Sequence, residues 1–206
     1  MIFQPTFFAP VIQYVYLSKT EQIRFEQFDN FQKQTYRNRC YIYGANGMQL
    51  LTVPIKHTKS NSNQKTKDVE IDHSFNWRRN MIKSLEASYR SSPFFEFYED
   101  DIIEVFEKKH RFLLDLNLQS FEVIEQCLQS GRSYEFTTEF QLSYDKAEDQ
   151  RILANAKTAS DHKLEPYTQV FESKHGFIPN LSILDLLFNE GTAALDYLER
   201  QKTECF

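Results

Sequence analysis

The sequence predicts a mixed α/β fold, in which a single domain of residues 1–206 has a small central sheet flanked by helices. Runs of β-prone residues alternate along the chain with stretches whose apolar residues recur at helical spacing. A chain of 206 residues is long enough to enclose one full hydrophobic core. Only 5 glycines and 6 prolines are present, which excludes a repetitive or low-complexity chain.

The N-terminal segment predicts a strand, a short helix and a second strand. Residues 2–8 are aromatic and β-prone. Pro10 fits the first turn of a helix over residues 11–18, because a helix start does not need the N–H that proline lacks. Residues 21–28 contain alternating apolar and charged side chains, as in a half-buried strand. This order predicts a parallel strand pair with an unusually short crossover.

A β-hairpin is predicted next. Residues 37–43 and 48–55 are both β-prone, and the sequence Gly-Ala-Asn-Gly at 44–47 joins them. The polar residues 56–67 are expected to form a mobile excursion between strands. A further short strand is expected at residues 69–71.

The middle of the chain predicts three helices. Ser74 is a suitable N-cap for a helix over residues 75–90. Residues 94–128 carry apolar side chains at helical spacing over a length that suits two helices. Gly131 follows them as a C-terminal stop.

The last third of the chain is predicted to contain both kinds of element. They are short strands at 134–138 and 168–171, a weak helix or linker within 143–163, a helix over 181–189 capped by Pro179 and Asn180, and a last helix over 192–201. Together with the earlier segments, these elements complete a mixed α/β domain.

Charge is divided unevenly along the chain. The net charge is −5, but residues 1–80 hold 11 Lys and Arg against 6 Asp and Glu, whereas residues 81–206 hold 13 against 23. A basic first part suits an anionic small-molecule substrate, such as a sugar nucleotide or an acyl carrier. A nucleic-acid partner is disfavoured, because the chain is acidic overall and contains no long Lys/Arg cluster or recognition motif.

The cysteines and the hydropathy pattern predict a cytoplasmic protein. Cys40, Cys127 and Cys205 cannot all pair with one another, and none lies in a CxxC motif, so we interpret them as reduced thiols. No signal peptide is indicated, and no apolar stretch approaches the roughly 20 residues of a transmembrane segment. The oligomeric state is left open.

Common catalytic and cofactor motifs are absent from the sequence. The five histidines show no metal-binding spacing, so no metal site is expected. No Walker loop, GxGxxG motif or GxSxG motif occurs. The sequence therefore leaves the cofactor unknown.

The best candidate for ligand binding is the sequence Arg37-Asn38-Arg39. The arginine guanidinium is a rigid fork of donors that matches carboxylate and phosphate. On a strand, Arg37 and Arg39 would point to one face and Asn38 to the other, so both arginines could hold one anionic group. The alternative is a solvated strand edge or a structural ion pair. If Arg37 holds a ligand, Arg37→Ala should leave the melting temperature of the protein nearly unchanged.

Three more residues are candidates for substrate binding. Asn76 and Trp77 stand at the start of a predicted helix, where free N–H groups attract anions. Trp77 also fits the apolar stripe of that helix, which favours a core position. Asn180 precedes a largely apolar helix and is a candidate for hydrogen bonding to hydroxyls of the substrate.

Two carboxylates are candidates for catalysis. Glu86 lies among Arg79, Lys83 and Arg90 at helical spacings, so it belongs either to a surface ion-pair set or to a site. Asp185 shares a helical stripe with Ser182 and Asn189, which is either the solvated side of the helix or part of a site.

Cys40 is a weaker candidate for covalent catalysis. The charge of Arg39 could lower the pKa of its thiol, and His57 or His73 could pair with it. The alternative, that Cys40 is a small buried strand residue, is favoured because free cysteines are usually buried.

Several motifs together resemble the WbqC-like protein family, in the order in which that family has them. They are YRNRCYI with ANG (36–47), LTVPIK (51–56), VEIDxSxNWRR (69–79), KSLEASYRSSPFFE (83–96) and FIPNLSILDLLFNEG (177–191). The family is bacterial, and its name comes from a gene of O-antigen clusters. The resemblance implies a cytosolic role in making or decorating a precursor of a surface polysaccharide.

The chain departs from the family pattern at two places. Members often have a histidine near the N-terminal proline motif, where residues 4–10 read QPTFFAP. Many also have a glycine-rich segment with a tyrosine before the last strand, and residues 147–167 contain no such segment. If either feature carries catalysis in the family, the activity of this chain is altered.

The resemblance and the residues lead to two main hypotheses. The first is a transferase that moves an acyl or aminoacyl group on a nucleotide- or lipid-linked sugar. In this hypothesis Arg37 and Arg39 hold the anion. The hydroxyls of the substrate are bound by Asn38, Asn76 and Asn180. Glu86 or Asp185 orients these groups or acts as a base. The alternative is a non-catalytic binding or scaffold protein of a polysaccharide-assembly pathway. Acyl transfer through Cys40 is a third hypothesis.

Overall fold

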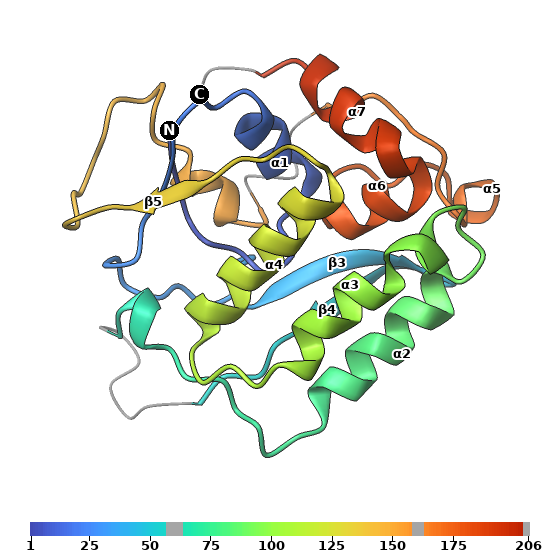
Figure 1. Ribbon diagram of the computed structural model, residues 1–206, viewed down its shortest axis with the longest axis horizontal. Helices are drawn as coiled ribbons and strands as arrows, with labels where there is room; N and C mark the ends of the chain where they lie inside the picture. Colours follow the sequence, from blue (N-terminus) through green and yellow to red (C-terminus); the bar gives the residue numbers. More distant parts are fainter. Residues whose placement is uncertain (57–63, 158–162, 204–206) are drawn as a thin grey trace.

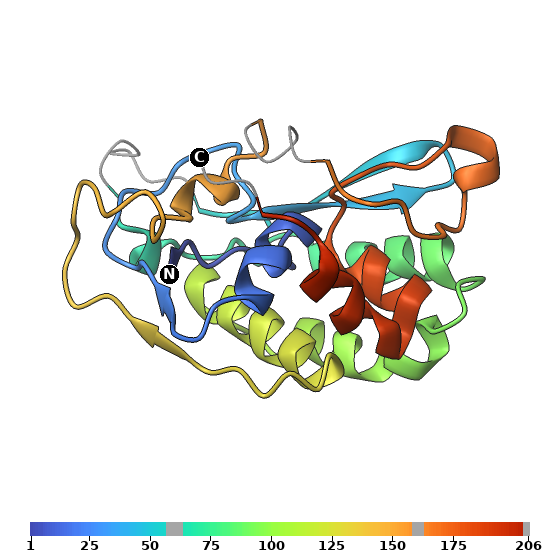
Figure 2. The same ribbon diagram turned by 90° about the horizontal axis from the view of Figure 1, so that it is seen from above.

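The computed structural model describes residues 1–56, 64–157 and 163–203 and has a mixed α/β architecture (Figure 1). Two small sheets take the place of the one central sheet that the sequence predicts. Figure 2 shows an antiparallel hairpin along one side of the molecule and the middle helices along the other.

The first sheet contains three parallel strands in the order β1-β2-β5. They are β1 (Ile2–Phe3), β2 (Ile23–Phe25) and β5 (Tyr134–Phe136). The short helix α1 (Val11–Ser18) makes the crossover between β1 and β2, and Pro10 occupies its N-cap. The predicted strand, short helix and parallel strand are therefore confirmed.

The second sheet is the predicted hairpin. Strands β3 (Arg39–Gly44) and β4 (Gly47–Thr52) are antiparallel, and Gly44 pairs with Gly47 across a two-residue turn. Gly47 has a φ of 97°, a conformation that residues with a Cβ rarely adopt. Because β3 begins at Arg39, Arg37 lies outside the strand, and the prediction that both arginines share a strand face is wrong.

The middle of the chain forms three helices, as predicted. They are α2 (Trp77–Tyr89), α3 (Phe95–Glu107) and α4 (Leu113–Cys127). Each packs against the next in sequence through one buried face. The start of α2 differs from the prediction, since its N-cap is Asn76 instead of Ser74.

Among the described residues of the C-terminal part, three more helices occur, which are α5 (Glu172–His175), α6 (Ile183–Glu190) and α7 (Ala194–Arg200). Single 3₁₀ turns occur as η1 (Thr66–Asp68), η2 (Arg151–Ala154) and η4 (Gly191–Ala193). The two helices predicted over 181–189 and 192–201 thus correspond to α6 and to η4 with α7.

Some predicted elements are absent or fall outside the described residues. The strand predicted at 168–171 is wrong, since this segment has no strand pairing. Residues 69–71 form only isolated bridges, to Ile55 and Phe112. Of the excursion expected at 56–67 and the weak helix or linker expected within 143–163, residues 57–63 and 158–162 lie outside the described residues.

Helix α6 is at the centre of the core. Every residue from Ile183 to Asn189 is buried, and α6 contacts α1, α3, α7 and β3. The residues before it connect two distant parts of the chain. Ser182 donates its N–H to the Tyr41 carbonyl at 2.7 Å and its hydroxyl to the Phe8 carbonyl at 2.8 Å.

None of the helices in the described parts of the chain is long and apolar enough to cross a membrane.

Gly191 after α6 provides a test of the packing. Its φ is +55°, and a Cβ built there would lie 2.5 Å from the Phe94 ring. Gly131 has a similar φ of +67° but open space around it. We expect Gly131→Ala to lower the free energy of unfolding by about 1 kcal/mol through backbone strain. Gly191→Ala should cost roughly 2–4 kcal/mol, because overpacking adds to that strain.

Urea denaturation of the two variants measures both values. Equal losses of stability for Gly131→Ala and Gly191→Ala would contradict the close packing of Phe94 against residue 191.

Candidate functional site

A cleft of about 830 Å³ lies at the carboxyl ends of the parallel strands. It runs between the segment that follows β2 and the segment that follows β5. Its lining includes Gln4, Asp29, Asn30, Phe31, Gln32, Arg37, Phe140, Leu142, Ser143, Tyr144, Lys146, Asp149, Arg151, Ile152 and Asn155. In parallel sheets, ligands bind at this end of the strands. We refer to these residues as the sheet-end cleft.

The floor of the sheet-end cleft contains a buried ion pair. Arg37 Nη2 lies 2.5 Å from Asp29 Oδ2, and the two side chains are only 3% and 8% exposed. Gln4 donates to the same carboxylate oxygen at 2.8 Å, and the Thr66 hydroxyl donates to the other at 2.5 Å. Each oxygen of Asp29 therefore accepts at least one hydrogen bond.

The Arg37 guanidinium is less completely satisfied than its partner. Its Nη1 donates to the Thr35 hydroxyl at 3.3 Å, whereas its Nε has no hydrogen-bond partner among the described residues. Burial lowers the pKa of Arg37 and the charge of Arg151 lowers it further, while Asp29 acts in the opposite direction. An anionic ligand in the cleft would offset the mutual repulsion of the two guanidiniums.

Arg151 forms one wall of the cleft. Its guanidinium makes a two-pronged contact with Asp149, at 2.8 and 2.6 Å, and lies 4.8 Å from the Tyr144 ring centre. It also donates to the carbonyls of Gln141 and Leu142. The hydrogen bonds that Arg151 donates to Asp149 raise the pKa of Arg151, so its positive charge is fixed. Arg151 thereby holds the segment after β5 against the sheet.

Glu26 is a buried carboxylate behind this wall. It follows β2 directly and is 0% exposed. Its Oε1 accepts from the Phe28 N–H at 2.7 Å and from the Thr137 hydroxyl at 3.2 Å. Its Oε2 makes no hydrogen bond within the described part of the chain, and Arg151 Nη1 lies 4.0 Å away. A buried carboxylate oxygen without a partner is rare in folded proteins and marks Glu26 as a candidate functional group.

The rim of the cleft is apolar. Phe140, Leu142 and Ile152 are 44%, 88% and 45% exposed. Lys65 lies 5.6 Å from the centre of the Phe140 ring. A charged floor below an apolar rim suits a ligand that joins an anionic group to an apolar or aromatic part.

Of the predicted arginine-rich motif, the structure brings only Arg37 to the sheet-end cleft. Asn38 donates to the Val53 carbonyl at 3.0 Å and so helps to hold the hairpin. Arg39, the first residue of β3, is not part of the cleft lining. The burial of Arg37 also changes the expected effect of Arg37→Ala. Removing one partner of a buried ion pair costs about 3–5 kcal/mol, so the melting temperature should fall.

The other predicted substrate-binding residues lie away from this cleft. The side chain of Asn180 accepts from the Ile12 N–H at 2.9 Å and so caps α1. Asn180 has a φ of 56°, which asparagine tolerates better than most residues. Trp77 is buried against Phe106, with ring centres 6.4 Å apart. Asn76 is exposed at the start of α2.

The two predicted catalytic carboxylates do not border the sheet-end cleft either. Glu86 lies on the outer side of α2, 3.6 Å from Arg90, in the surface arrangement that was one of its two interpretations. Asp185 is fully buried. It accepts hydrogen bonds from the hydroxyls of Tyr89 and Tyr167, at 2.8 and 2.6 Å, and from the Gln169 amide at 2.8 Å. Burial raises the pKa of Asp185 to about 6.

Cys40 does not have the properties of a nucleophile. Burial raises the pKa of its thiol to about 12, so the charge of Arg39 does not produce a thiolate. His73 is bonded to the His110 carbonyl, and His57 lies outside the described residues. Cys40 and Cys127 are free thiols, and Cys205 falls in the part of the chain that is not described. Over the described ranges, no group of three potential ligands is placed to bind a metal.

Sequence reasoning missed most of the sheet-end cleft. Gln4, Glu26 and Thr137 directly follow β1, β2 and β5, but the strands predicted at 2–8, 21–28 and 134–138 include them, so correct strand ends would have been the signal. Polar residues immediately after parallel strands meet at the same edge of a sheet. Arg151 carried no such signal, because its partners lie in an irregular segment.

Comparisons with known proteins agree on one family. The model of the WbqC-like protein family matches residues 4–165, which contain every lining residue of the sheet-end cleft. The chain is 26% identical over 199 residues to the "Uncharacterized protein Rv1507c" of Mycobacterium tuberculosis, covering 83% of this chain and 85% of that protein. No solved structure matches.

The buried carboxylate of Asp185 predicts a specific pH dependence. Its pKa is about 6 in the folded protein against 3.8 as the ordinary value, so the folded state binds more protons between these pH values. The contribution of Asp185 to stability is therefore present below pH 4 and is lost as the pH rises through 6. Asp185→Asn removes this titration.

Urea denaturation from pH 4 to pH 7 checks this. The free energy of unfolding of the wild type, relative to Asp185→Asn, should fall by about 2.4 kcal/mol over that range. Asp196→Asn, on the exposed side of α7, should show the same pH dependence of the free energy of unfolding as the wild type. A constant difference between wild type and Asp185→Asn would contradict the raised pKa.

Proposed function

The chain belongs to the WbqC-like protein family, and from this premise we propose that the sheet-end cleft binds the anionic part of a nucleotide- or lipid-linked sugar. The role would be in the synthesis of a bacterial surface polysaccharide of the O-antigen type. The reaction proposed is transfer of an acyl or aminoacyl group to the sugar.

One observation carries the proposal: two guanidiniums, Arg37 and Arg151, border one cleft of about 830 Å³. Clefts of 300–1,000 Å³ are typical for small-molecule ligands. Arginine holds phosphate and carboxylate groups through paired hydrogen bonds. Asn30, Gln32 and Asn155 in the lining supply amide groups for sugar hydroxyls.

The apolar rim supports a substrate with more than a sugar and a phosphate. Phe140, Tyr144 and Ile152 border the cleft above the charged floor. A nucleotide base could stack on the aromatic rings, and a lipid or acyl chain could cover the aliphatic ones. A nucleotide-linked sugar and a lipid-linked sugar would therefore make different contacts with the same rim.

Glu26 is the carboxylate best placed to act on a proton in this proposal. Its Oε2 is free of hydrogen bonds in the described structure, while Asp29 and Asp149 are engaged by their partners. Because Glu26 is fully buried behind the cleft lining, in a transfer reaction it would take the proton of an attacking hydroxyl or amine through one intervening water. Glu86 and Asp185 are given no role, because neither lies in the cleft lining nor contacts a lining residue of opposite charge, whereas Glu26 lies 4.0 Å from Arg151 of the lining.

A non-catalytic binding or scaffold protein is the second candidate function. The engagement of Asp29 by Gln4, Arg37 and Thr66 favours it, because the carboxylate on the floor of the cleft already has partners for both oxygens within the protein. Under this alternative the cleft holds the same ligand without turnover.

A ligand screen with matched variants tests binding. Nucleotide sugars, acyl-CoA species and free nucleotides are scanned for thermal stabilisation, and hits are measured by calorimetry. Arg151→Lys keeps the charge but loses the fork, and Lys146→Ala removes an exposed cleft residue. We expect about a tenfold weaker affinity for each. Lys83→Ala, an exposed residue of α2, should bind as the wild type does.

Turnover then separates the two functions. Glu26→Gln should retain binding and lose turnover if the protein is a transferase. Wild-type protein that binds a ligand but never turns it over with any acyl donor would favour the scaffold function. Affinities that do not respond to Arg151→Lys or Lys146→Ala would rule out the sheet-end cleft as the binding site.

A further inference from the structure

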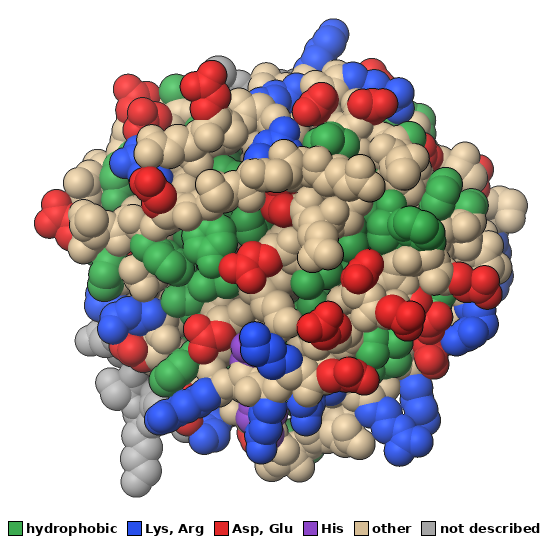
Figure 3. Space-filling model, viewed as in Figure 1, with side chains coloured by type: hydrophobic (Ala, Val, Ile, Leu, Met, Phe, Trp, Pro, Cys, Tyr) green, Lys and Arg blue, Asp and Glu red, His purple; other side chains and the backbone are tan. Residues whose placement is uncertain are grey.

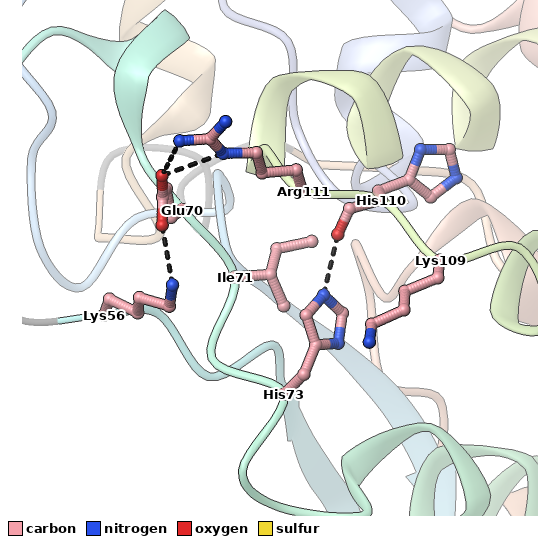
Figure 4. A pocket seen from close by; sticks show the side chains of 7 residues that line it. All are labelled: Lys56, Glu70, Ile71, His73, Lys109, His110 and Arg111. Atoms are coloured by element: carbon pink, nitrogen blue, oxygen red, sulfur yellow. Dashed lines mark hydrogen bonds and ion pairs between the residues drawn. The ribbon is translucent and has the colours of Figure 1, made fainter.

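A second cleft, of about 360 Å³, shares no residue with the sheet-end cleft. Figure 4 shows its polar side chains, among them Lys56, Glu70, His73, Lys109 and Arg111. We refer to these five residues as the basic cleft. In Figure 3, Lys, Arg and His side chains gather along the lower part of the face shown, where the connection between α3 and α4 lies in Figure 1.

Three chain segments build the basic cleft, and backbone hydrogen bonds join them. Lys56 follows the hairpin, and its N–H donates to the Glu70 carbonyl at 2.9 Å. The Ile71 N–H donates to the Arg111 carbonyl at 2.9 Å. The Asp72 N–H donates to the Pro54 carbonyl at 2.9 Å. The charged side chains therefore project from a fixed framework, which favours a built site over a chance surface cluster.

The basic cleft holds more positive than negative charge. Glu70 is its one carboxylate, and it is shared between Lys56 Nζ at 2.7 Å and the Arg111 guanidinium at 2.7 and 2.9 Å. Hydrogen bonds from Lys56 and Arg111 lower the pKa of Glu70, so it stays ionised. Lys109 makes no ion pair with any described residue. Three cations against one carboxylate leave an excess of two positive charges.

His73 gives the basic cleft a fixed wall. Its Nε2 lies 2.7 Å from the His110 carbonyl, which can only accept, so Nε2 carries the proton. Its ring also lies beside Trp77, with centres 6.4 Å apart. In Figure 4 the Lys109 side chain extends toward the His73 ring. Lys109 lines the same cleft as Lys56 and Arg111, on the side of the His73 ring.

We propose that the basic cleft binds a phosphate group, as a phosphate monoester or as inorganic phosphate. A phosphate monoester carries about two negative charges at neutral pH, which matches the excess of two positive charges. Arg111 offers a planar fork to two phosphate oxygens, and Lys56 and Lys109 act as mobile point charges. The phosphate competes with Glu70 for Lys56 and Arg111, so Glu70 weakens binding.

The proposal is tested by calorimetric titration with inorganic phosphate, glucose 1-phosphate and sulfate at constant ionic strength. Phosphate should bind saturably. Lys109→Ala and Arg111→Ala should each weaken it about tenfold. Lys108→Ala removes the same charge from the neighbouring exposed position and should change the affinity less than about twofold. Melting curves confirm that each variant is folded.

Glu70→Gln separates a phosphate site from a structural ion-pair network. It should tighten phosphate binding several-fold, because the competing carboxylate is gone. Weaker binding by Glu70→Gln, or equal losses for Lys108→Ala and Lys109→Ala, would overturn the proposal. So would a phosphate affinity that Arg151→Lys lowers, because the ion would then bind in the sheet-end cleft.

The two phosphate sources are told apart by the same titrations. Tighter binding of glucose 1-phosphate than of inorganic phosphate identifies an organic monoester as the ligand. Equal affinities identify the free ion. Sulfate that binds as tightly as both would contradict a site for phosphate and indicate a general anion surface.

Discussion

Burial of the Asp29 carboxylate is the constraint on which the arrangement of the N-terminal half depends. Burying an ionised carboxylate costs roughly several kcal/mol of desolvation free energy unless other hydrogen-bond donors replace the water. Those donors come from Gln4 after β1, from Arg37 before β3 and from Thr66 of η1. The parallel sheet, the hairpin and the turn after it must therefore meet at one point. The sheet-end cleft opens above this point, so its floor is positioned by electrostatics as well as by apolar packing.

Short-range patterns made much of the fold predictable. The parallel pair around α1 and the hairpin with its two-residue turn follow from alternation, proline and glycine within about 25 residues. No strand forms at 168–171, where one was expected, because tertiary contacts override local propensity. There the Gln169 side chain bonds the Ile178 backbone at both N–H and carbonyl, and the segment is held by side chains instead of a strand partner.

The candidate site was less predictable, because its residues gain their properties from distant partners. Arg37 was identified by residue type, but its burial depends on Asp29 and Thr66. Glu26 is bonded to Thr137, 111 residues away, and nothing in its own neighbourhood signals that contact. Asp185 shows the opposite case. Its polar stripe left open a solvated helix face or a site, yet the hydroxyls of Tyr89 and Tyr167 allow a carboxylate at the centre of the core.

The cap of α1 comes from the far end of the chain. Asn180 accepts from the Ile12 N–H across 168 residues, and the Leu181 carbonyl accepts from the Val11 N–H. Contacts over such separations require closure of a long loop and therefore form slowly. During synthesis, α1 leaves the ribosome long before residue 180 has been added. The first helix therefore remains uncapped until residues 180 and 181 have been made, and the apolar N-terminal segment is exposed to chaperones and to aggregation until then.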